Sequence, residues 1–189
     1  SFSPNKTITT GQGGVVLLND DTLEVRLREL KDQGRPVRGT GGEDTHERIG
    51  FNFKLTNLQA AIGIAQLNSL PVRIVRMKQN YLQYLERLKD IKELTLLPFN
   101  VEEGEVPQWV DVLTPKRDEL VEFLEAREIF CKKFWFPMHT HNPYHLPDEN
   151  FPNSTRLAAQ AFWLPSCFSL SDADVDLVCN QIHEFFRKN

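Results

Sequence analysis

SFSPNKTITTGQGG, residues 1–14, is the most informative stretch of this 189-residue chain. In it Lys6 lies among small hydroxyl and amide side chains, and the glycines Gly11, Gly13 and Gly14 follow. A lysine amine that is held neutral attacks a carbonyl group and forms a Schiff base. Hydroxyl groups and glycine amides beside it suit a phosphate group. From these residues alone, Lys6 is either a covalent catalyst beside a phosphate site or a solvated surface lysine, and the stretch is not a P-loop.

The composition indicates a folded protein without a large charge excess. Apolar residues make up 40% of the chain, and 22 basic side chains stand against 26 acidic ones, for a net charge of −4. A nucleic-acid backbone needs a basic surface, and a membrane-spanning helix needs about 18 consecutive apolar residues, so we expect neither a nucleic-acid nor a membrane partner. The three cysteines form no C-x-x-C pair, which favours a reducing, cytoplasmic location over a disulfide-bonded protein.

The segment after the glycines predicts a strand, a helix and a loop. Residues 15–18, VVLL, form a short apolar run that is typical of a strand. Asp21 is the predicted N-cap of a helix that ends before Gly34. Residues 34–50 are rich in glycine and charge and predict a loop.

A second helix is predicted after a capping box formed by Thr56 and Gln59. Its alanines and glycine suit close packing, either in a core or at a subunit interface. Pro71 is expected to end this helix, and a longer amphipathic helix is expected to follow, to about residue 90. The apolar stripe of that longer helix consists of Ile74, Met77, Tyr81, Tyr84 with Leu85, and Leu88.

The part of the chain after about residue 100 predicts a small α/β domain. Residues 106–113 and 129–136 predict strands, and Pro115 predicts the start of a helix between them. Ser171 and Asp174 form a third capping box, which opens a terminal helix. We therefore expect a strand, a helix, a strand and a helix in this order.

Together with residues 1–14, three further stretches resemble the DegT/StrS-type nucleotide-sugar aminotransferases, and the perosamine-synthase-like members are the nearest. The stretches are GFNFKLTNLQAAIGIAQLNSL at 50–70, KKFWFPMHTHNPY at 132–144 and LPSCFSLSDADVDLVCNQI at 164–182. The resemblance implies an α/β fold, that of the aspartate-aminotransferase-like (fold type I) enzymes that depend on pyridoxal 5'-phosphate (PLP).

The resemblance also implies how the chain is divided. Residues 1–70 correspond to the C-terminal part of the PLP-binding large domain, 71–98 to a connecting long helix, and 99–189 to the small C-terminal α/β domain. The family's phosphate-binding helix, its ring-stacking aromatic residue and the aspartate that pairs with the pyridinium nitrogen are expected to precede Ser1. The chain is therefore expected to be an incomplete fragment that is inactive by itself.

Carried over residue by residue, the resemblance assigns the chemistry to Lys6. It implies that Lys6 forms a Schiff base with PLP and then moves the proton as an amino group passes from an amino acid, such as glutamate, to a keto sugar nucleotide. Ser1 corresponds to a hydroxyl against the cofactor phosphate. Asn52 corresponds to a residue that reaches that phosphate from the neighbouring subunit, which implies a homodimer. The implied role is polysaccharide or lipopolysaccharide biosynthesis in the cytoplasm.

A later segment is implied to bind the substrate. His139 and Trp135 correspond to residues that line the sugar-nucleotide pocket, while the neighbouring aromatic residues suit a core or an interface. Lys132 replaces the arginine of many members, and its point charge suits a pyrophosphate without bidentate geometry. Gln12 stands where the family more often has glutamate, so no role is assigned to it.

Two other interpretations remain open at this point. The first is a non-catalytic sugar-nucleotide-binding or assembly module that keeps the fold without the chemistry. The second is a metal protein built on His139, His141 and His145, but Pro143 interrupts this segment and no acidic or thiolate ligand is spaced to complete it, so no metal site is predicted. The alternating aspartates at 172–176 lack the glycine and glutamate of a calcium loop and fit a charged first helical turn.

Overall fold

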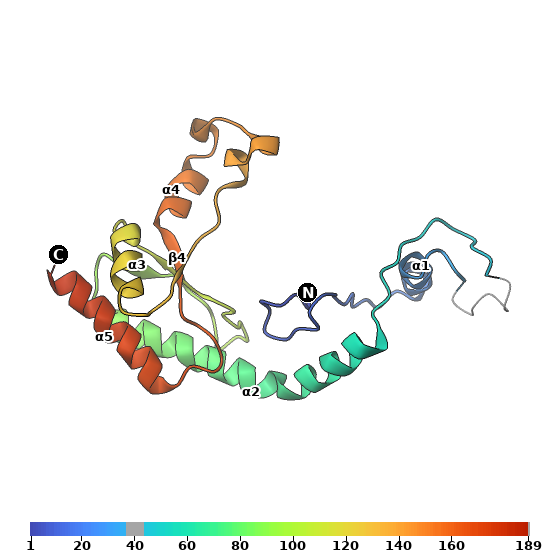
Figure 1. Ribbon diagram of the computed structural model, residues 1–189, viewed down its shortest axis with the longest axis horizontal. Helices are drawn as coiled ribbons and strands as arrows, with labels where there is room; N and C mark the ends of the chain where they lie inside the picture. The colour runs from blue at the N-terminus through green and yellow to red at the C-terminus, as the bar shows by residue number, and fades with distance from the viewer. Residues whose placement is uncertain (37–43, 189) are drawn as a thin grey trace. The chain divides into compact units, whose positions relative to one another are not determined.

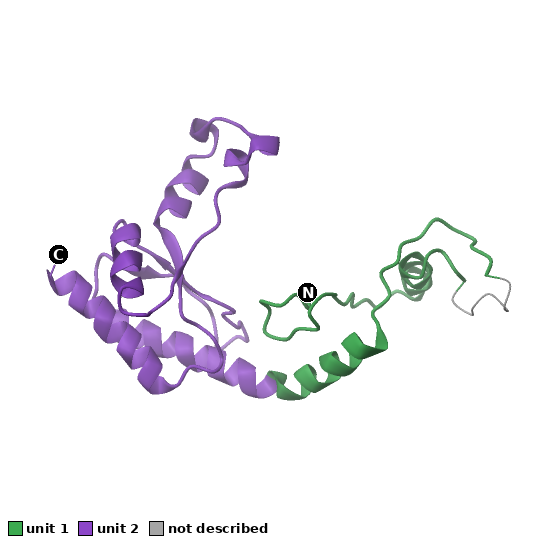
Figure 2. Ribbon diagram, viewed as in Figure 1, with its two compact units in different colours: residues 1–70 green, residues 71–189 purple. Residues whose placement is uncertain are grey.

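The computed structural model describes residues 1–36 and 44–188. The chain divides into two compact units, Ser1–Leu70 and Pro71–Asn189 (Figure 1, Figure 2). Part of the loop predicted at 34–50 therefore lies outside the described residues.

Helix α1 (Asp21–Lys31) in the first unit is defined by its caps. The Asp20 carboxylate accepts a hydrogen bond from the Leu23 N–H at 2.8 Å, so the N-cap lies one residue before the predicted Asp21. The strand predicted at 15–18 is wrong, because these residues form no regular element and most of their apolar side chains are exposed. A short strand without a neighbour leaves its backbone groups unpaired, and residues 1–36 and 44–188 contain no strand that pairs with this one.

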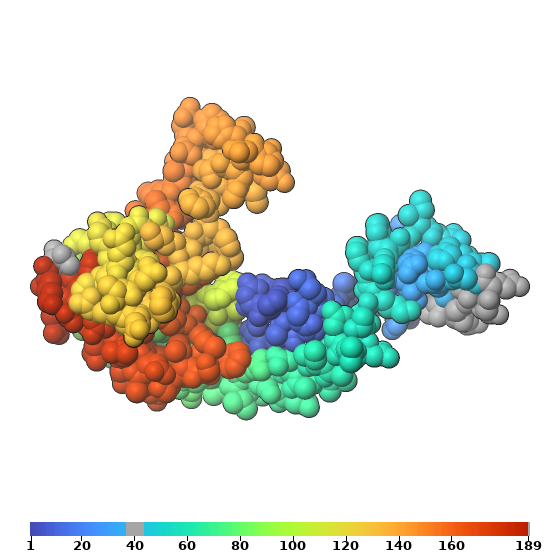
Figure 3. Space-filling view, viewed as in Figure 1, coloured from blue at the N-terminus to red at the C-terminus, as the bar shows by residue number. Residues whose placement is uncertain are grey.

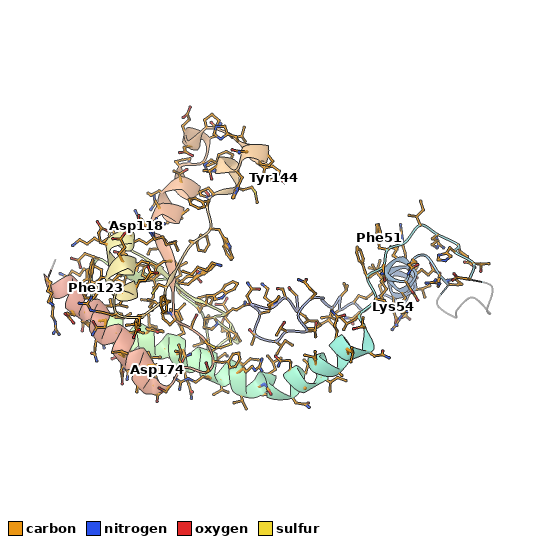
Figure 4. All side chains as sticks on the ribbon, in the orientation of Figure 1. Phe51, Lys54, Asp118, Phe123, Tyr144 and Asp174 are labelled. Carbon is orange, nitrogen blue, oxygen red and sulfur yellow. The ribbon has the colours of Figure 1, made fainter. Side chains whose placement is uncertain are left out.

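After α1 the chain returns closely past the C-terminal end of that helix. The Phe51 N–H donates to the Leu30 carbonyl at 2.6 Å. This crossing requires glycine, because a Cβ on Gly34 would lie 1.8 Å from the Arg48 carbonyl oxygen. Figure 4 labels Phe51 and Lys54 on the returning segment beside α1.

Helix α2 (Asn57–Leu88) begins at the predicted capping box and crosses from the first unit into the second. The Thr56 N–H donates to Gln59 Oε1 at 3.1 Å, and the Gln59 N–H donates to Thr56 Oγ1 at 3.2 Å. The expectation that Pro71 ends the helix is wrong, because α2 runs through it. Proline removes one helical hydrogen bond, and burial of the following turns offsets that loss. The buried residues of α2 are Met77, Asn80, Tyr81, Tyr84 and Leu88.

The second unit is built on a four-stranded antiparallel sheet with the order β1-β2-β4-β3. The strands predicted at 106–113 and 129–136 are present but shorter. Strand β4 was not predicted, because all four of its residues are buried and the alternation that marks a half-exposed strand is missing. The strands are β1 (Thr95–Leu96), β2 (Val110–Leu113), β3 (Lys132–Lys133) and β4 (Ala161–Leu164).

Helices α3 (Arg117–Glu125) and α5 (Asp172–Lys188) join the C-terminal half of α2 over one face of this sheet, and α5 runs alongside α2 (Figure 1). Helix α3 begins two residues after the predicted Pro115. The capping box of α5 is confirmed, because the Ser171 N–H donates to Asp174 Oδ2 at 2.7 Å. The hydrophobic core therefore belongs to the second unit.

Between β3 and β4 the chain leaves the sheet and projects from the rest of the second unit (Figure 3). Tyr144 lies in this projection (Figure 4). Its elements are three short 3-10 helices, η1 (Met138–Thr140), η2 (Asn142–Tyr144) and η3 (Asp148–Asn150), and helix α4 (Pro152–Gln160), which was not predicted. In the part of the chain that the structure describes, no helix has the length and apolar character needed to cross a membrane.

Candidate functional site

The N-terminal stretch forms a closed loop that carries Lys6. The Phe2 N–H donates to the Gly13 carbonyl at 2.9 Å, and the Thr10 N–H donates to the Phe2 carbonyl at 3.1 Å. Within the loop, the Lys6 N–H donates to the Ser3 carbonyl at 3.1 Å, which closes a turn. The Lys6 side chain is partly exposed. The backbone therefore fixes the position from which the amine extends.

Glycine and small residues make this closure possible. Gly13 has φ +124°, and a Cβ there would lie 2.8 Å from Leu55 Cδ1. Thr10 is buried, and its hydroxyl donates to the Gln12 carbonyl at 2.5 Å. A Cβ on Gly63 of α2 would lie 3.2 Å from Thr10 Cγ2. The absence of a side chain at Gly63 therefore lets the Lys6 loop pack closely against α2.

The loop also presents hydroxyl groups near its start. Ser1 Oγ and Ser3 Oγ lie 3.1 Å apart, and Ser3 Oγ donates to Asn5 Oδ1 at 3.1 Å. Hydroxyl groups on an exposed loop can turn their donors toward an anion. The loop thus combines a primary amine with hydroxyl donors, and these groups fit the aldehyde and the phosphate of PLP.

Asn52 lies elsewhere in the first unit, on the segment that returns past α1. Its backbone forms a β-bridge with Asp32, and its side chain is exposed. The neighbouring Lys54 ammonium donates to Asp32 Oδ2 at 2.7 Å, and this hydrogen bond lowers the pKa of the Asp32 carboxyl. The segment that carries Asn52 is therefore fixed to Asp32 both by the backbone bridge and by the Lys54 side chain.

His139 is enclosed within the projection of the second unit. Its side chain is 5% exposed, and its ring stacks on Phe151 with centroids 4.5 Å apart. Its Nε2 lies 2.9 Å from Asp148 Oδ1 and 3.3 Å from Thr155 Oγ1. These contacts join η1, η3 and α4, so His139 has a structural role that its sequence motif did not reveal.

Trp135 and Lys132 come together around Trp163, which sequence analysis did not assign to the site. The Trp135 and Trp163 centroids lie 4.5 Å apart, and Lys132 Nζ lies 5.3 Å from the Trp163 centroid. Trp109 stacks on Trp163 at 4.8 Å, and Asp111 accepts the Trp163 indole N–H. A signal was available, because all three tryptophans of the chain belong to this cluster and Asp111 interrupts an otherwise apolar strand.

His139, His141 and His145, for which no metal site is predicted, all lie in the projection. Across residues 1–36 and 44–188, no group of three or more histidine, cysteine, aspartate or glutamate side chains is arranged to hold a metal ion.

Comparison with known proteins gives a consistent result. Residues 1–183 match the DegT/DnrJ/EryC1/StrS aminotransferase family. GDP-perosamine synthase of Escherichia coli O157:H7 is 34% identical over 192 residues, which cover 98% of this chain and 50% of that protein. The solved structure of S. venezuelae DesV is 25% identical with a TM-score of 0.82, and the match covers 97% of this chain and 50% of DesV. Helicobacter pylori PseC has a TM-score of 0.82 at 22% identity over 100% of this chain and 53% of PseC.

The chain spans about half the length of the curated relatives it matches. The structural matches confirm the predicted α/β fold of the fold type I PLP enzymes. Aminotransferases of this family depend on PLP, so the predicted cofactor is confirmed at the level of the family. The roles of the site residues and the three-part division of the chain stay predictions. By its match across residues 1–183, the chain belongs to the DegT/DnrJ/EryC1/StrS aminotransferase family.

Proposed function

We propose that this chain is part of a PLP-dependent aminotransferase that transfers an amino group from an amino acid, with glutamate as the expected donor, to a keto sugar nucleotide. The observation that carries the proposal is the family match across residues 1–183, with Lys6 inside a loop that glycine closes. The similarity to a GDP-perosamine synthase supports the substrate class. The proposed setting is polysaccharide or lipopolysaccharide biosynthesis in the cytoplasm.

Lys6 is the proposed catalytic residue. PLP, when bound, supplies an aldehyde carbon and a ring that withdraws electrons from the carbon that loses its proton. The Lys6 amine would hold PLP by condensing with that aldehyde carbon, with release of water, before the reaction. Once released, the same amine moves a proton between the cofactor C4′ carbon and the sugar C4 carbon, first as a base and then as an acid. The backbone hydrogen bond to Ser3 holds the origin of this side chain in place.

Ser1 and Asn52 are the proposed phosphate ligands. The Ser3 hydroxyl donates to Asn5 Oδ1 and lies 3.1 Å from the Ser1 hydroxyl, so the Ser1 O–H is the one that can turn from Ser3 and donate to the phosphate. Asn52 is exposed on its own unit, which suits a role toward a neighbouring subunit. The proposal therefore includes a homodimer in which Asn52 of one protomer serves the cofactor of the other.

Trp135, Lys132 and His139 are the proposed substrate residues. Trp135 is 51% exposed and presents an aromatic surface. Lys132 lies within cation–π distance of it, with Nζ 6.0 Å from the ring centroid, and supplies a positive charge for a pyrophosphate. His139 is buried, so its contribution is to the shape of the pocket wall.

Reduction with borohydride in the presence of PLP tests the role of Lys6 in the full-length protein. We expect the cofactor to become fixed to the peptide that carries Lys6, as identified by mass spectrometry. Lys6→Ala abolishes this labelling, and Lys31→Ala, which removes an exposed lysine of α1 in the same unit, leaves it unchanged. Equal labelling of wild type and Lys6→Ala would overturn the proposal. A stable sugar-nucleotide complex without any labelling would favour the non-catalytic binding module instead.

A further inference from the structure

One row of side chains crosses the face of the sheet that is opposite the hydrophobic core. The strand register places Asp111 of β2 opposite Trp163 of β4, and Trp163 opposite Lys132 of β3. Directly opposed residues share a face, whereas their sequence neighbours Val112 and Phe162 are fully buried in the core. A carboxylate, an indole and an ammonium group therefore stand in line across three strands.

All three tryptophans of the chain meet on this row. Trp109 stacks on Trp163 with an interplanar angle of 21°, and Trp135 meets Trp163 edge-on at 78°. Trp163 is 4% exposed, while Trp135 and Lys132 are exposed. Trp163 is thus the hidden centre of the cluster, and Trp135 and Lys132 are the groups that solvent or a ligand can reach.

Asp111 holds the central indole in place. The Trp163 Nε1–H donates to Asp111 Oδ1 at 2.6 Å, and hydrogen bonds to a carboxylate are stronger than those to a neutral acceptor. Removal from water raises the pKa of Asp111, and the indole hydrogen bond opposes that rise. A neutral amide would satisfy the indole without the cost of desolvating a charge. The carboxylate therefore orients the Trp163 indole by a stronger hydrogen bond than a neutral amide acceptor would form.

We propose that Asp111 is a positioning residue for nucleotide binding: through Trp163 it fixes the exposed Trp135 ring and the Lys132 ammonium that contact the nucleoside diphosphate of the substrate. This inference rests on the proposed function, which assigns Trp135 and Lys132 to the substrate. A base stacks on an aromatic ring without needing a particular hydrogen-bond pattern. Lys132 meets a phosphate as a point charge. Fixing both groups before binding reduces the ordering that binding has to impose.

Near-UV circular dichroism tests the hold of Asp111 on the cluster. Asp111→Leu removes the acceptor with little change in volume, and we expect it to reduce the tryptophan bands. Asp111→Asn keeps an oxygen acceptor, and we expect it to retain the tryptophan bands that Asp111→Leu loses. The control is Asp90→Leu, which replaces an exposed aspartate in the turn after α2 and leaves the bands unchanged.

Calorimetry with GDP, UDP and TDP tests the functional consequence. We expect Asp111→Leu to weaken binding of the preferred nucleotide about tenfold, because binding then has to order the Trp135 and Lys132 side chains. Trp135→Ala weakens it by about 5- to 150-fold, the range for loss of one base stack. In turnover, Asp111→Leu raises KM for the sugar nucleotide and leaves kcat nearly unchanged. Asp111→Leu added to Trp163→Phe, which lacks the indole N–H, has no further effect.

A folded Asp111→Leu variant that binds the nucleotide as wild type does would overturn the inference, and so would failure of wild type to bind any of the three nucleotides. If Asp111→Leu does not fold, Trp163→Phe takes its place, and unchanged affinity in that variant overturns the inference equally. The labelling of Lys6 is measured separately. Failure of wild type to bind any of the three nucleotides, with intact labelling of Lys6, contradicts only this inference, whereas absent labelling contradicts the proposed function.

Discussion

Single residues in this chain are held by contacts that their types alone do not reveal. His139 belongs to a histidine-rich motif, yet its Nε2 is engaged by Asp148 and Thr155 and its ring stacks on Phe151. Gly13 belongs to a run of glycines, yet it differs from Gly11 in the atoms that surround it. At this scale the environment determines the consequence of a substitution.

His139→Ala is expected to lower the free energy of unfolding by about 1–3 kcal/mol, because it removes a buried ring that stacks on Phe151 and leaves the Thr155 hydroxyl without its partner. Urea denaturation followed by circular dichroism measures this change. His141→Ala is the matched control, since His141 is exposed, and is expected to change stability by less than about 0.5 kcal/mol. Equal losses in the two variants would contradict a structural role specific to His139.

Gly13→Ala is expected to destabilise the Lys6 loop more than Gly11→Ala. Both positions have positive φ, +124° and +81°, so alanine is strained at each. Only at Gly13 does the added Cβ meet a neighbour, 2.8 Å from Leu55 Cδ1, whereas nothing lies within 4 Å at Gly11. Urea denaturation and the amount of PLP retained after gel filtration measure the difference. A Gly11→Ala variant that loses as much PLP as Gly13→Ala would show that the contact with Leu55 is irrelevant.

At the scale of elements, the capping boxes at two helix starts were predictable and the strand partners were not. The capping boxes of Thr56 with Gln59 and of Ser171 with Asp174 are local, three residues apart, and both are confirmed. Strand β4 depends on partners far away in sequence, so its buried residues carried no recognisable period. The predicted helix end at Pro71 was wrong, because local propensity favours a break there, while burial of later turns of α2 stabilises the continuous helix.

Pro71→Ala is expected to raise the free energy of unfolding, by up to about 3 kcal/mol, because alanine restores a backbone hydrogen bond inside α2 and relieves the clash of the proline ring. Thermal unfolding followed at 222 nm measures the effect. Val72→Ala, an exposed substitution one residue later, is the control and is expected to have little influence. A lower stability of Pro71→Ala would show that the proline is required in this helix.

Asp118 links helix α3 to strand β3, and its contribution depends on pH. Hydrogen bonds from Arg117 and Lys133 lower the pKa of Asp118 from 3.8 to about 2. Because the folded pKa is the lower one, the contribution to stability is complete above about pH 4 and is lost as the pH falls toward 2. The effect is small, since the side chain is largely exposed.

Asp118→Asn is therefore expected to be less stable than wild type at pH 6, and the difference is expected to vanish near pH 2. Denaturant titrations at a series of pH values measure it. Asp90→Asn, in the turn after α2, controls for the loss of one exposed carboxylate. A difference that grows on acidification would contradict the assigned direction of the shift.

At the scale of the whole molecule, the two units differ in how they bury apolar surface. The buried hydrophobic cluster contains residues between Tyr81 and Phe185, all in the second unit. The first unit exposes large apolar side chains, among them Leu17, Ile49 and Phe53. Stability is therefore concentrated in the second unit.

Hydrogen exchange measured by mass spectrometry is expected to reflect this division. We expect the slowest exchange in β2, β4, α5 and the C-terminal half of α2, which line the core. Residues 15–18, which form no regular element, are expected to exchange fast. Comparable protection of residues 15–18 and β4 would contradict this distribution.

The sequence was sufficient for the parts of the site that lie close together along the chain. Lys6, its glycines and its hydroxyl neighbours form one loop, as a contiguous motif can. The hydrogen bond between Trp163 and Asp111 joins residues far apart in sequence, and only the pairing of β2 with β4 brings them together. A pattern read along the chain does not contain that pairing.

The position of β4 in the sheet has a consequence for synthesis on the ribosome. Strand β4 lies between β2 and β3, although it follows both in the chain. During translation β2 and β3 cannot pair with β4 until the nascent polypeptide has emerged beyond Leu164. The whole projection between β3 and β4 is therefore made before the sheet that carries it can close, and slow elongation in this interval would prolong exposure of unpaired strand edges to other chains.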